Sequence, residues 1–307
     1  MIKLSNGQSF TYVNSSGSLG FDCLGWWWER PLVWFGFIKP KLFANVVRTA
    51  TLNPRLYPVS NLSWIRPWTW LPWSPWSCVR FLPGGAVNKV GLYNPGFEWL
   101  CEKVYSRLDF KKYKLIASIH GTKEELVQMA WRLNCFDFVA IEINVSCPNT
   151  EHKSATLETI ESTKAVAEVC CHPIIIKISA DQDYITIARA LKGCVQAISL
   201  NSVPWKTAFP DEQKSPLWKL EQKRGGGGGG VSGKPAQRHN WAVARRLVIQ
   251  GLIPVICPGI MNRGDLVEVR GTVGPGAYSF GTIYLRKPWL ATQIVEGEMK
   301  KESNHSS

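Results

Sequence analysis

Residues Phe138 to Asn149 read FVAIEINVSCPN, and this stretch determines how the rest of the chain is interpreted. Its first eight residues are apolar almost without interruption, which is typical of a strand buried on both faces of a parallel sheet. Directly after this strand stand Ser146, Cys147, Pro148 and Asn149. A cysteine placed there and fixed by a following proline can act through its thiolate as a base or nucleophile. Taken alone, such a cysteine is more often a small buried hydrophobe, so its surroundings must decide.

Apolar runs of the same kind recur along the chain and alternate with helical segments. Buried strands are predicted at Lys114–Ile119, Phe138–Val145, Pro173–Ile178, Val195–Leu200, Ile253–Ile256 and Ala277–Phe280. Helices, with apolar residues three and four positions apart, are predicted at Pro95–Leu108, Thr122–Asn134, Leu157–Cys170, Asp181–Leu191, Gln237–Gln250 and Lys287–Met299. Earlier strands are expected at Val33–Phe37, Val46–Thr51 and Val87–Leu92. This alternation indicates parallel strands joined by crossover helices.

The helix starts agree with this pattern, because Thr122 precedes Glu125 by three residues as a capping box and Asp181 can cap the helix after it. Periodicity alone leaves two architectures, an open doubly wound sheet and a closed barrel. A strand count close to eight, with polar residues at the strand ends, favours a (β/α)8 TIM barrel. We expect one barrel domain over residues 1–299 and a polar, frayed tail over residues 300–307.

Composition and charge exclude several classes of protein. The chain is 45% hydrophobic and 19% charged, which supports a packed core. Its net charge of +13 is spread along the sequence without a stacking or zinc motif, so nucleic-acid binding is not expected. The nine cysteines are odd in number and none is spaced as a metal knuckle, so neither a disulfide framework nor a metal site is predicted. With no signal peptide and no spanning apolar run, the expected location is the cytoplasm.

Tryptophan is unusually abundant, and nine of the 15 tryptophans lie before residue 77. The stretch Ser63–Pro75 alternates Trp with Pro and Ser, so it cannot form a regular helix. We interpret residues 57–84 as an insertion in the domain. One hypothesis is a loop that contacts a membrane surface or a partner. The favoured interpretation is an elaborated loop whose rings cover the mouth of the barrel.

The run from Asn144 to Asn149 resembles the Asn, Ser, Cys, Pro, Asn hallmark of the dihydroorotate dehydrogenase family. With cysteine at position 147 the chain resembles the class 1 members of the family. The membrane-associated, quinone-using class carries serine at this position. The resemblance implies an FMN-binding barrel in which Cys147 removes the C5 proton of dihydroorotate while the C6 hydride passes to FMN. It covers about Ser15 to Thr282 and is weakest over residues 57–84.

The resemblance also implies a substrate site built from segments far apart in the sequence. Four asparagines suit a pyrimidine edge because an amide offers both donors and an acceptor, although an asparagine after a strand is commonly only a turn residue. The implied substrate residues are Arg48, Asn88, Val90, Gly91, Leu92, Asn144, Asn149, Asn201 and Ser202. Arg48 stands where the family usually has lysine. Because the two side chains differ in reach and donor geometry, the substrate carboxylate is expected to be held differently here.

Lys177 lies inside the apolar run Ile174–Ser179, where a charge is costly unless it is paired. A buried partner is therefore predicted, with outward snorkelling as the alternative. By resemblance, Lys177 lies beside the flavin pyrimidine and stabilises the negative charge of the reduced ring. We therefore count it with Cys147 as catalytic.

The phosphate end of FMN requires backbone N–H groups that no side chain obstructs. By resemblance, the cofactor contacts are Lys177 together with Ser16, Gly17, Gly230, Ser232, Gly233, Gly259, Gly281 and Thr282. Pro258 replaces a glycine of one phosphate loop, which removes one N–H from it. The glycine tract Gly225–Gly230 resembles a flexible linker, and we interpret it as a mobile loop that ends in a cofactor contact.

The leading hypothesis is therefore an oxidoreductase that converts dihydroorotate to orotate in pyrimidine biosynthesis. The alternatives are another dihydropyrimidine oxidoreductase, and a flavin-free protein that uses the same scaffold for membrane or partner docking. The second electron acceptor stays open between fumarate, NAD through a partner subunit, and a quinone. A homodimer is compatible with the sequence, which does not determine the oligomeric state.

Overall fold

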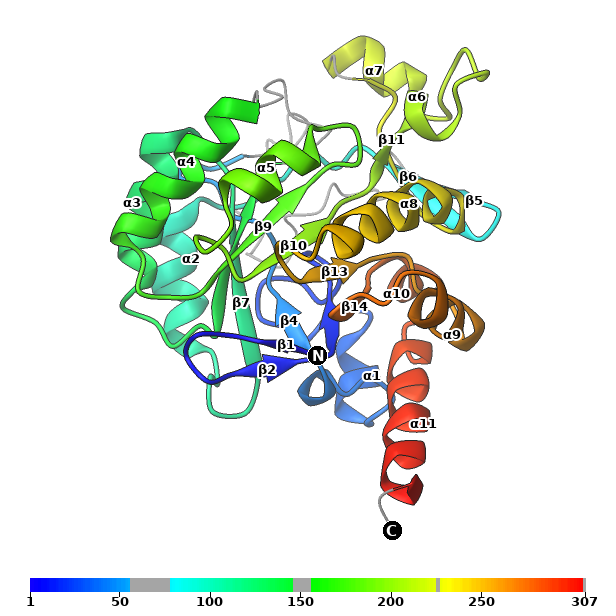
Figure 1. Cartoon of the computed structure of the whole chain (residues 1–307), viewed down its shortest axis with the longest axis horizontal. Helices are drawn as coiled ribbons and strands as arrows, with labels where there is room; N and C mark the ends of the chain where they lie inside the picture. Colours follow the sequence, from blue (N-terminus) through cyan, green and yellow to red (C-terminus); the bar gives the residue numbers. More distant parts are fainter. Residues whose placement is uncertain (56–77, 146–155, 225–226, 306–307) are drawn as a thin grey trace.

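The computed structural model describes residues 1–55, 78–145, 156–224 and 227–305. Within them, eight parallel strands close into a barrel in the order β10-β13-β14-β3-β4-β7-β8-β9 (Figure 1). These strands are β3 (Tyr12–Asn14), β4 (Ala44–Val46), β7 (Lys114–Ile119), β8 (Ala140–Asn144), β9 (Ile174–Ile178), β10 (Ala197–Leu200), β13 (Val255–Cys257) and β14 (Ala277–Phe280). Each pair of neighbouring strands is parallel. The predicted (β/α)8 barrel is confirmed.

Helices surround this barrel (Figure 1). The longer ones are α2 (Phe97–Lys103), α3 (Lys123–Leu133), α4 (Thr156–Val169), α5 (Tyr184–Ala190), α8 (Lys234–Gln250), α9 (Arg263–Thr272) and α11 (Leu290–His305). The shorter ones are α1 (Arg30–Trp34), η1 (Pro40–Leu42), η3 (Tyr105–Arg107), α6 (Trp205–Ala208), α7 (Trp218–Arg224) and α10 (Thr282–Arg286). The capping box at Thr122 and Glu125 is present, but the cap of α5 is Asp183 instead of Asp181.

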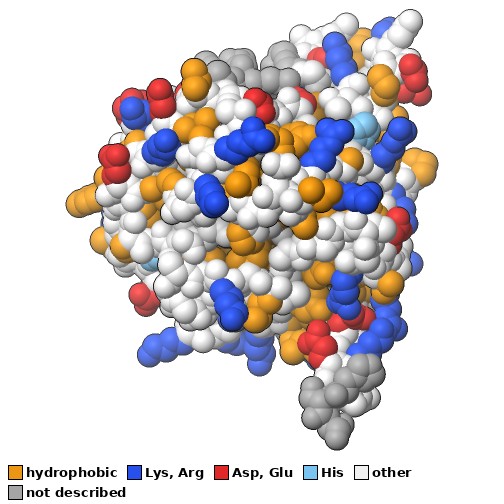
Figure 2. Space-filling view, in the orientation of Figure 1, with side chains coloured by type: hydrophobic (Ala, Val, Ile, Leu, Met, Phe, Trp, Pro, Cys, Tyr) orange, Lys and Arg blue, Asp and Glu red, His pale blue; other side chains and the backbone are white. Residues whose placement is uncertain are grey.

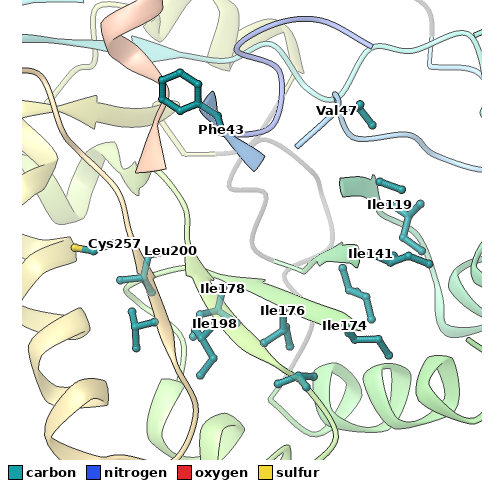
Figure 3. Packing of buried hydrophobic residues seen from close by; sticks show 14 of the residues in the cluster. Phe43, Val47, Ile119, Ile141, Ile174, Ile176, Ile178, Ile198, Leu200 and Cys257 are labelled. Atoms are coloured by element: carbon teal, nitrogen blue, oxygen red, sulfur yellow. The ribbon is translucent and has the colours of Figure 1, made fainter. Parts of the chain in front are cut away.

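The two faces of each barrel strand enter different environments. Ile174, Ile176 and Ile178 of β9 belong to the large core cluster between strands and helices, and Figure 3 shows them along one side of that strand. Ile175 instead joins a layer inside the barrel with Ile116, Ala197 and Ala277, among others. Successive side chains of a strand point to opposite faces, so Lys177 lies on the same inner face as Ile175, two residues further toward the carboxyl end.

A two-stranded hairpin covers the amino-terminal end of the barrel. Strand β1 (Ile2–Lys3) pairs with β2 (Ser9–Phe10), and Ile2, Leu4 and Phe10 are buried against the inner apolar layer. This end is therefore filled by hydrocarbon, and polar inner side chains occur only toward the carboxyl ends of the strands. The asymmetry agrees with the general rule that (β/α)8 enzymes carry their sites at the carboxyl face.

A second sheet of four antiparallel strands lies beside the barrel. Its order is β11-β12-β6-β5, with β11 (Val203–Pro204), β12 (Gly230–Gly233), β6 (Gly85–Asn88) and β5 (Val79–Leu82). Val87, Val203 and Val231 form a small core with Trp205 and Leu217. This sheet brings residues 85–88 next to residues 230–233.

Several predicted elements need correction. Val33–Phe37 is not a strand: Pro31 stands at the start of α1, and Trp34, Phe35 and Phe37 are exposed. The first barrel strand is Tyr12–Asn14, which is too short to give a periodic signal. Val46–Thr51 overlaps β4 only at its first residue, because the strand is Ala44–Val46. Val87–Leu92 meets the second sheet at its start and does not enter the barrel.

Two helices also differ from expectation. Helix α9 was not predicted, because Gly264 and Gly271 weaken its pattern, yet Asn262 caps it by accepting a hydrogen bond from the Asp265 backbone N–H. Helix α11 extends through residues 300–305, which were expected to be frayed. The buried carboxylate of Glu298 pairs there with Arg263, Arg270 and Lys301, which stabilises the last turns.

The surface agrees with the diffuse charge of the sequence. Figure 2 shows Lys and Arg side chains spread over this face, with Asp and Glu among them. Among the described helices, none combines the length and the apolar character needed to cross a bilayer.

Candidate functional site

A cavity of about 310 Å³ opens at the carboxyl ends of the barrel strands and collects most of the residues predicted for the site. Among its lining residues are Ser16, Gly17, Arg48, Asn88, Val90, Gly91, Leu92, Asn144, Lys177, Asn201, Ser202, Ser232, Gly233, Gly259, Gly281 and Thr282. Gly230 does not line it; its carbonyl accepts a hydrogen bond from Asn88 at 3.4 Å. Cys147 and Asn149, both predicted site residues, lie outside the described residues.

Lys177 is buried in this cavity beside a carboxylate. Its Nζ atom lies 3.5 Å from Oε1 of Glu142, and both side chains are almost fully buried. The two residues come from the adjacent strands β8 and β9, which hold them on the inner face of the barrel. The predicted buried partner is thus Glu142, and the snorkelling alternative is wrong.

A chain of hydroxyl groups connects this ion pair to Ser16, which lines the cavity. The Ser118 hydroxyl donates to Glu142 Oε1 at 3.0 Å, and the Ser118 and Thr49 hydroxyls lie 2.8 Å apart. Thr49 also contacts the Ser16 hydroxyl at 3.0 Å and accepts from the Asn144 amide at 3.2 Å. Thr49 is therefore the point where the segments bearing Ser16, Asn144 and Glu142 meet.

Arg48 provides a second buried cation. Its guanidinium carbon lies 5.3 Å from the centre of the Trp26 ring and 5.7 Å from that of Phe21. Burial lowers the pKa of Arg48 to about 10, while Cys78 and Tyr93 oppose this shift. Arg48 therefore remains charged near neutral pH.

Glu29 also lines the cavity and is only 2% exposed. Burial raises the pKa of this carboxyl to about 7, and the hydrogen bond from the Trp26 backbone N–H partly opposes the rise. Glu29 thus titrates near neutral pH.

The loop that follows β6 has an unusual backbone. Gly91 has φ +82° and Leu92 has φ +61°, a left-handed conformation that leucine rarely adopts. The buried side chain of Asn94 holds this turn, because its amide donates to the Leu92 carbonyl and to the Thr51 hydroxyl, both at 2.8 Å. The structure thus presents residues 90–92 to the cavity in a fixed conformation.

Glycines form the other end of the cavity. Gly233 and Gly259 have positive φ, and a Cβ atom on Gly233 would lie 2.7 Å from the Gly84 carbonyl oxygen. On Gly281 a Cβ atom would lie 3.2 Å from the Ser15 hydroxyl. At Gly233 the neighbouring backbone leaves no room for a side chain, and such a close backbone approach is the chemistry that a phosphate cradle needs.

Asn240 adds a polar group that protein atoms leave unsatisfied. Its amide donates to the Asn201 carbonyl at 3.0 Å, while its buried Oδ1 atom has no hydrogen-bond partner in the described part of the chain. A buried acceptor left this way is costly unless a ligand donates to it. Together with the glycine cradle and the Lys177 cation, it fits a cofactor with a phosphate, a polyol chain and an anionic reduced ring, as FMN has.

A second, larger hollow of about 670 Å³ lies next to this cavity and shares only Leu285 with its lining. Phe81, Met261, Ile283 and Leu290 line its apolar part. None of the predicted site residues that the structure describes lies in it, so we assign the chemistry to the smaller cavity.

Several site residues were missed by the sequence prediction, namely Trp26, Glu29, Thr49, Ser118, Glu142 and Asn240. A signal existed for two of them. Residues alternate faces along a strand, so Glu142 falls on the same side as the predicted Asn144, and Ser118 interrupts an apolar run in the same way. The others face the cavity because of tertiary packing.

A closed parallel barrel with a glycine-rich cradle and a buried lysine at its carboxyl end fits a flavin-dependent oxidoreductase of the (β/α)8 type. The family model described as dihydroorotate dehydrogenase matches residues 77–301 of this chain. The chain belongs to the dihydroorotate dehydrogenase family.

Relatives of the chain bear the name "Dihydroorotate dehydrogenase B (NAD(+)), catalytic subunit". The protein from Caldicellulosiruptor saccharolyticus is 34% identical over 70% of this chain and 72% of its own length. That from Bacteroides thetaiotaomicron is 31% identical over 73% of this chain and 75% of its own. That from Enterococcus faecalis is 25% identical over 74% of each.

Family membership confirms the class of enzyme and the reaction predicted from the sequence. The protein is an oxidoreductase that oxidises dihydroorotate in pyrimidine biosynthesis, and its cofactor is FMN. The relatives are named as catalytic subunits, so each of them belongs to a complex with another subunit.

Proposed function

We propose that the cavity at the carboxyl end of the barrel binds dihydroorotate and FMN together, with Cys147 as the base of a class 1 site. The observation that carries this proposal is the convergence of Arg48, Asn88, Asn144, Lys177 and Asn201 on one cavity. These residues come from five separate segments of the chain. Each of them was predicted as a site residue from a motif in the sequence.

Cys147 would take the C5 proton of dihydroorotate through its thiolate. FMN, when bound, accepts the hydride that leaves C6, so that loss of the proton and of the hydride yields the C5–C6 double bond of orotate. The segment that carries Cys147 follows β8 directly, and β8 ends at Asn144, whose amide donates to Thr49. The proposed base is therefore tethered to a strand end that is fixed inside the barrel.

The remaining polar residues would orient the substrate. Asn88, Asn144, Asn149 and Asn201 offer amide donors and acceptors to the pyrimidine ring, and Ser202 adds a hydroxyl group. Arg48 would bind the carboxylate, since it is a buried cation that lines the cavity. This assignment favours dihydroorotate over an uncarboxylated dihydropyrimidine.

The cofactor would be held at both ends. Gly233, Gly259, Gly281 and Thr282 would receive the phosphate, and Asn240 would accept a hydrogen bond from the cofactor through its unsatisfied oxygen. Ser16 and Gly17 would contact the ring. Lys177 would stabilise negative charge on the reduced ring, while Glu142 keeps the lysine in place.

The experiment is anaerobic reduction of the purified flavoprotein by dihydroorotate. The loss of flavin absorbance measures the rate of this reduction. We expect the Cys147→Ala variant to reduce its flavin roughly 10²–10⁴-fold more slowly, which is the usual contribution of a general base. In the unmodified protein the rate should rise with pH as the thiol ionises. Cys135→Ala, at an exposed cysteine, serves as the matched control. Full turnover by Cys147→Ala would show that the base is another group.

We further propose that this chain works with a partner subunit that passes electrons to NAD. The relatives that carry "NAD(+)" and "catalytic subunit" in their names support this. The chain alone should then be reduced by dihydroorotate but should not be reoxidised by NAD. Reoxidation can be compared directly for NAD, fumarate and a soluble quinone. Rapid reduction of NAD by the isolated chain would contradict the need for a partner. The cytoplasmic location remains a prediction.

A further inference from the structure

Arg48 differs from an ordinary buried arginine because no carboxylate of the described residues pairs with it. It is 7% exposed, and within the described residues its side chain forms neither an ion pair nor a hydrogen bond. Its backbone N–H donates to the Gly20 carbonyl at 2.9 Å, which fixes only the main chain. The guanidinium instead contacts the rings of Trp26 and Phe21. A buried, unpaired cation that lines a cavity indicates an anionic ligand.

The two rings compensate the charge without using its hydrogen-bond donors. A cation–π contact acts on the face of the ring and stabilises the cation electrostatically. The N–H donors of a guanidinium lie in its own plane and form a fork that matches a carboxylate. An acidic partner would occupy this fork, whereas aromatic partners leave it available for the ligand.

Trp26 is itself held by three separate contacts. Its indole Nε1–H donates to the Gly17 carbonyl at 3.2 Å. Its backbone N–H donates to Glu29 Oε2 at 2.9 Å. Its ring stacks on Trp28 with centroids 5.8 Å apart and an interplanar angle of 14°. The indole is therefore fixed in position where it meets Arg48.

The turn that carries Trp26 is closely packed. Gly25 has φ +86°, and a Cβ atom there would lie 2.8 Å from Cβ of Glu29. Trp26, Trp28 and Glu29 all line the cavity. This turn thus forms part of the site itself.

We propose that Trp26 is a positioning residue: together with Phe21 it holds the Arg48 guanidinium so that its in-plane donors bind the carboxylate of dihydroorotate. The inference rests on the proposed function and deepens it, because it assigns the discrimination between carboxylated and uncarboxylated rings to an aromatic clamp. The clamp consists of Phe21, Trp26 and Arg48.

The first test compares the binding of orotate with that of uracil, the same ring without its carboxylate, through changes in flavin absorbance. Trp26→Leu should weaken orotate binding roughly tenfold, the loss expected of a desolvated cation–π contact. Uracil binding should stay within about twofold of the unchanged protein. Trp26→Phe retains a ring and should recover most of the orotate affinity. Trp131→Leu, at an exposed tryptophan of α3, is the matched control.

Equal losses for orotate and uracil in Trp26→Leu would overturn the proposal, because they would indicate general damage to the site. Unchanged orotate binding would also overturn it. Should Trp26→Leu fail to fold, Phe21→Leu removes the other ring of the clamp and should show the same selective loss of orotate.

A second measurement does not depend on the reaction. Phenylglyoxal labels accessible arginines, and peptide mapping reports the rate at Arg48 alone. The clamp should make this rate slow, and Trp26→Leu should raise it roughly tenfold while Trp131→Leu leaves it unchanged. If the unchanged protein bound no orotate, the proposed function would fail, whereas the labelling would still decide whether Trp26 holds Arg48. Equal labelling in all three proteins would refute the clamp.

Discussion

Two cations are buried in the same cavity, and the protein compensates them in different ways. Lys177 lies 3.5 Å from the Glu142 carboxylate, which is joined through Ser118 to a chain of hydroxyls. The Arg48 guanidinium contacts two aromatic rings, and Arg48 has no carboxylate partner among the described residues. A buried charge can thus be tied into a hydrogen-bond network or presented to a ligand, depending on the chemistry of its partner.

The supporting elements differ as well. Lys177 and Glu142 belong to adjacent barrel strands, so the closed sheet fixes their separation. Arg48 follows β4, and the rings around it come from the segment before α1. We therefore expect the position of the Lys177 side chain to depend on its ion pair with Glu142. The position of the Arg48 side chain should depend on packing against the two rings.

The largest expected loss of stability comes from removing the Glu142 carboxylate, which pairs with Lys177 on the barrel strands. Glu142→Leu leaves Lys177 as an uncompensated buried charge, which should lower the free energy of unfolding by about 3–5 kcal/mol. The double variant Glu142→Leu with Lys177→Met removes both charges and should recover most of that loss, although it cannot support catalysis. Denaturant unfolding of the cofactor-free proteins measures both values.

The matched control for the Arg48 site is Trp26→Leu. It removes the packing of the indole ring against Arg48 and leaves the number of charged groups unchanged. Its loss of stability should be smaller than that of Glu142→Leu. A double variant no more stable than Glu142→Leu alone would mean that the lysine charge is not the origin of the loss, and the contrast between the two cations would fail.

Much of the fold could be predicted from the sequence, and the reason is physical. Strands such as Ile174–Ile178 are apolar on both faces, because the inner layer and the helices both bury them, so the run is nearly continuous. The first strand, Tyr12–Asn14, is three residues long and carries no such signal. Its pairing with β14 and β4 is determined by closure of the barrel.

The candidate site was predictable where a motif follows a strand, as at Asn144 and Asn201. Trp26, which contacts the buried cation of Arg48, was not predictable as a site residue. A tryptophan in an aromatic stretch of sequence shows no preference for a particular arginine. The contact with Arg48 depends on how residues 17–29 fold over the barrel end. Glu29 is hidden for the same reason, since its burial is a tertiary effect.

The next effect is a pH dependence of stability caused by Glu29, whose carboxyl accepts from the Trp26 backbone N–H. Glu29 has no cation partner among the described residues. Burial raises its pKa to about 7, so the folded state favours the neutral form. The resulting stability is complete below the unfolded pKa of about 4.5 and is lost as pH rises through about 7. The displacement corresponds to roughly 3 kcal/mol.

Glu29→Gln keeps an acceptor for the Trp26 N–H and cannot ionise. We expect its stability to match that of the unchanged protein near pH 4 and to exceed it by up to roughly 3 kcal/mol near pH 8. Thermal unfolding across this pH range tests the expectation. A variant less stable at pH 8 would indicate that Glu29 does meet a cation, and the two sides of the cavity would then be alike. Asp183→Asn, at an exposed cap, is a control for general pH effects.

The smallest expected loss of stability tests whether the Arg48 clamp and the Lys177–Glu142 ion pair are independent of each other. Thr49 follows Arg48 in the chain and bonds through Ser118 to Glu142, so its hydroxyl links the aromatic side to the ion pair. Thr49→Val keeps the shape and removes this link, which should cost about 1 kcal/mol because Ser118 and Asn144 lose a partner. Thr49→Ser retains the hydroxyl and is the control. If the link is only structural, combining Thr49→Val with Trp26→Leu should give additive losses of stability within about 0.5 kcal/mol. A larger coupling would mean that the clamp and the ion pair act as one network, because a change at either cation would then be transmitted through Thr49 to the other.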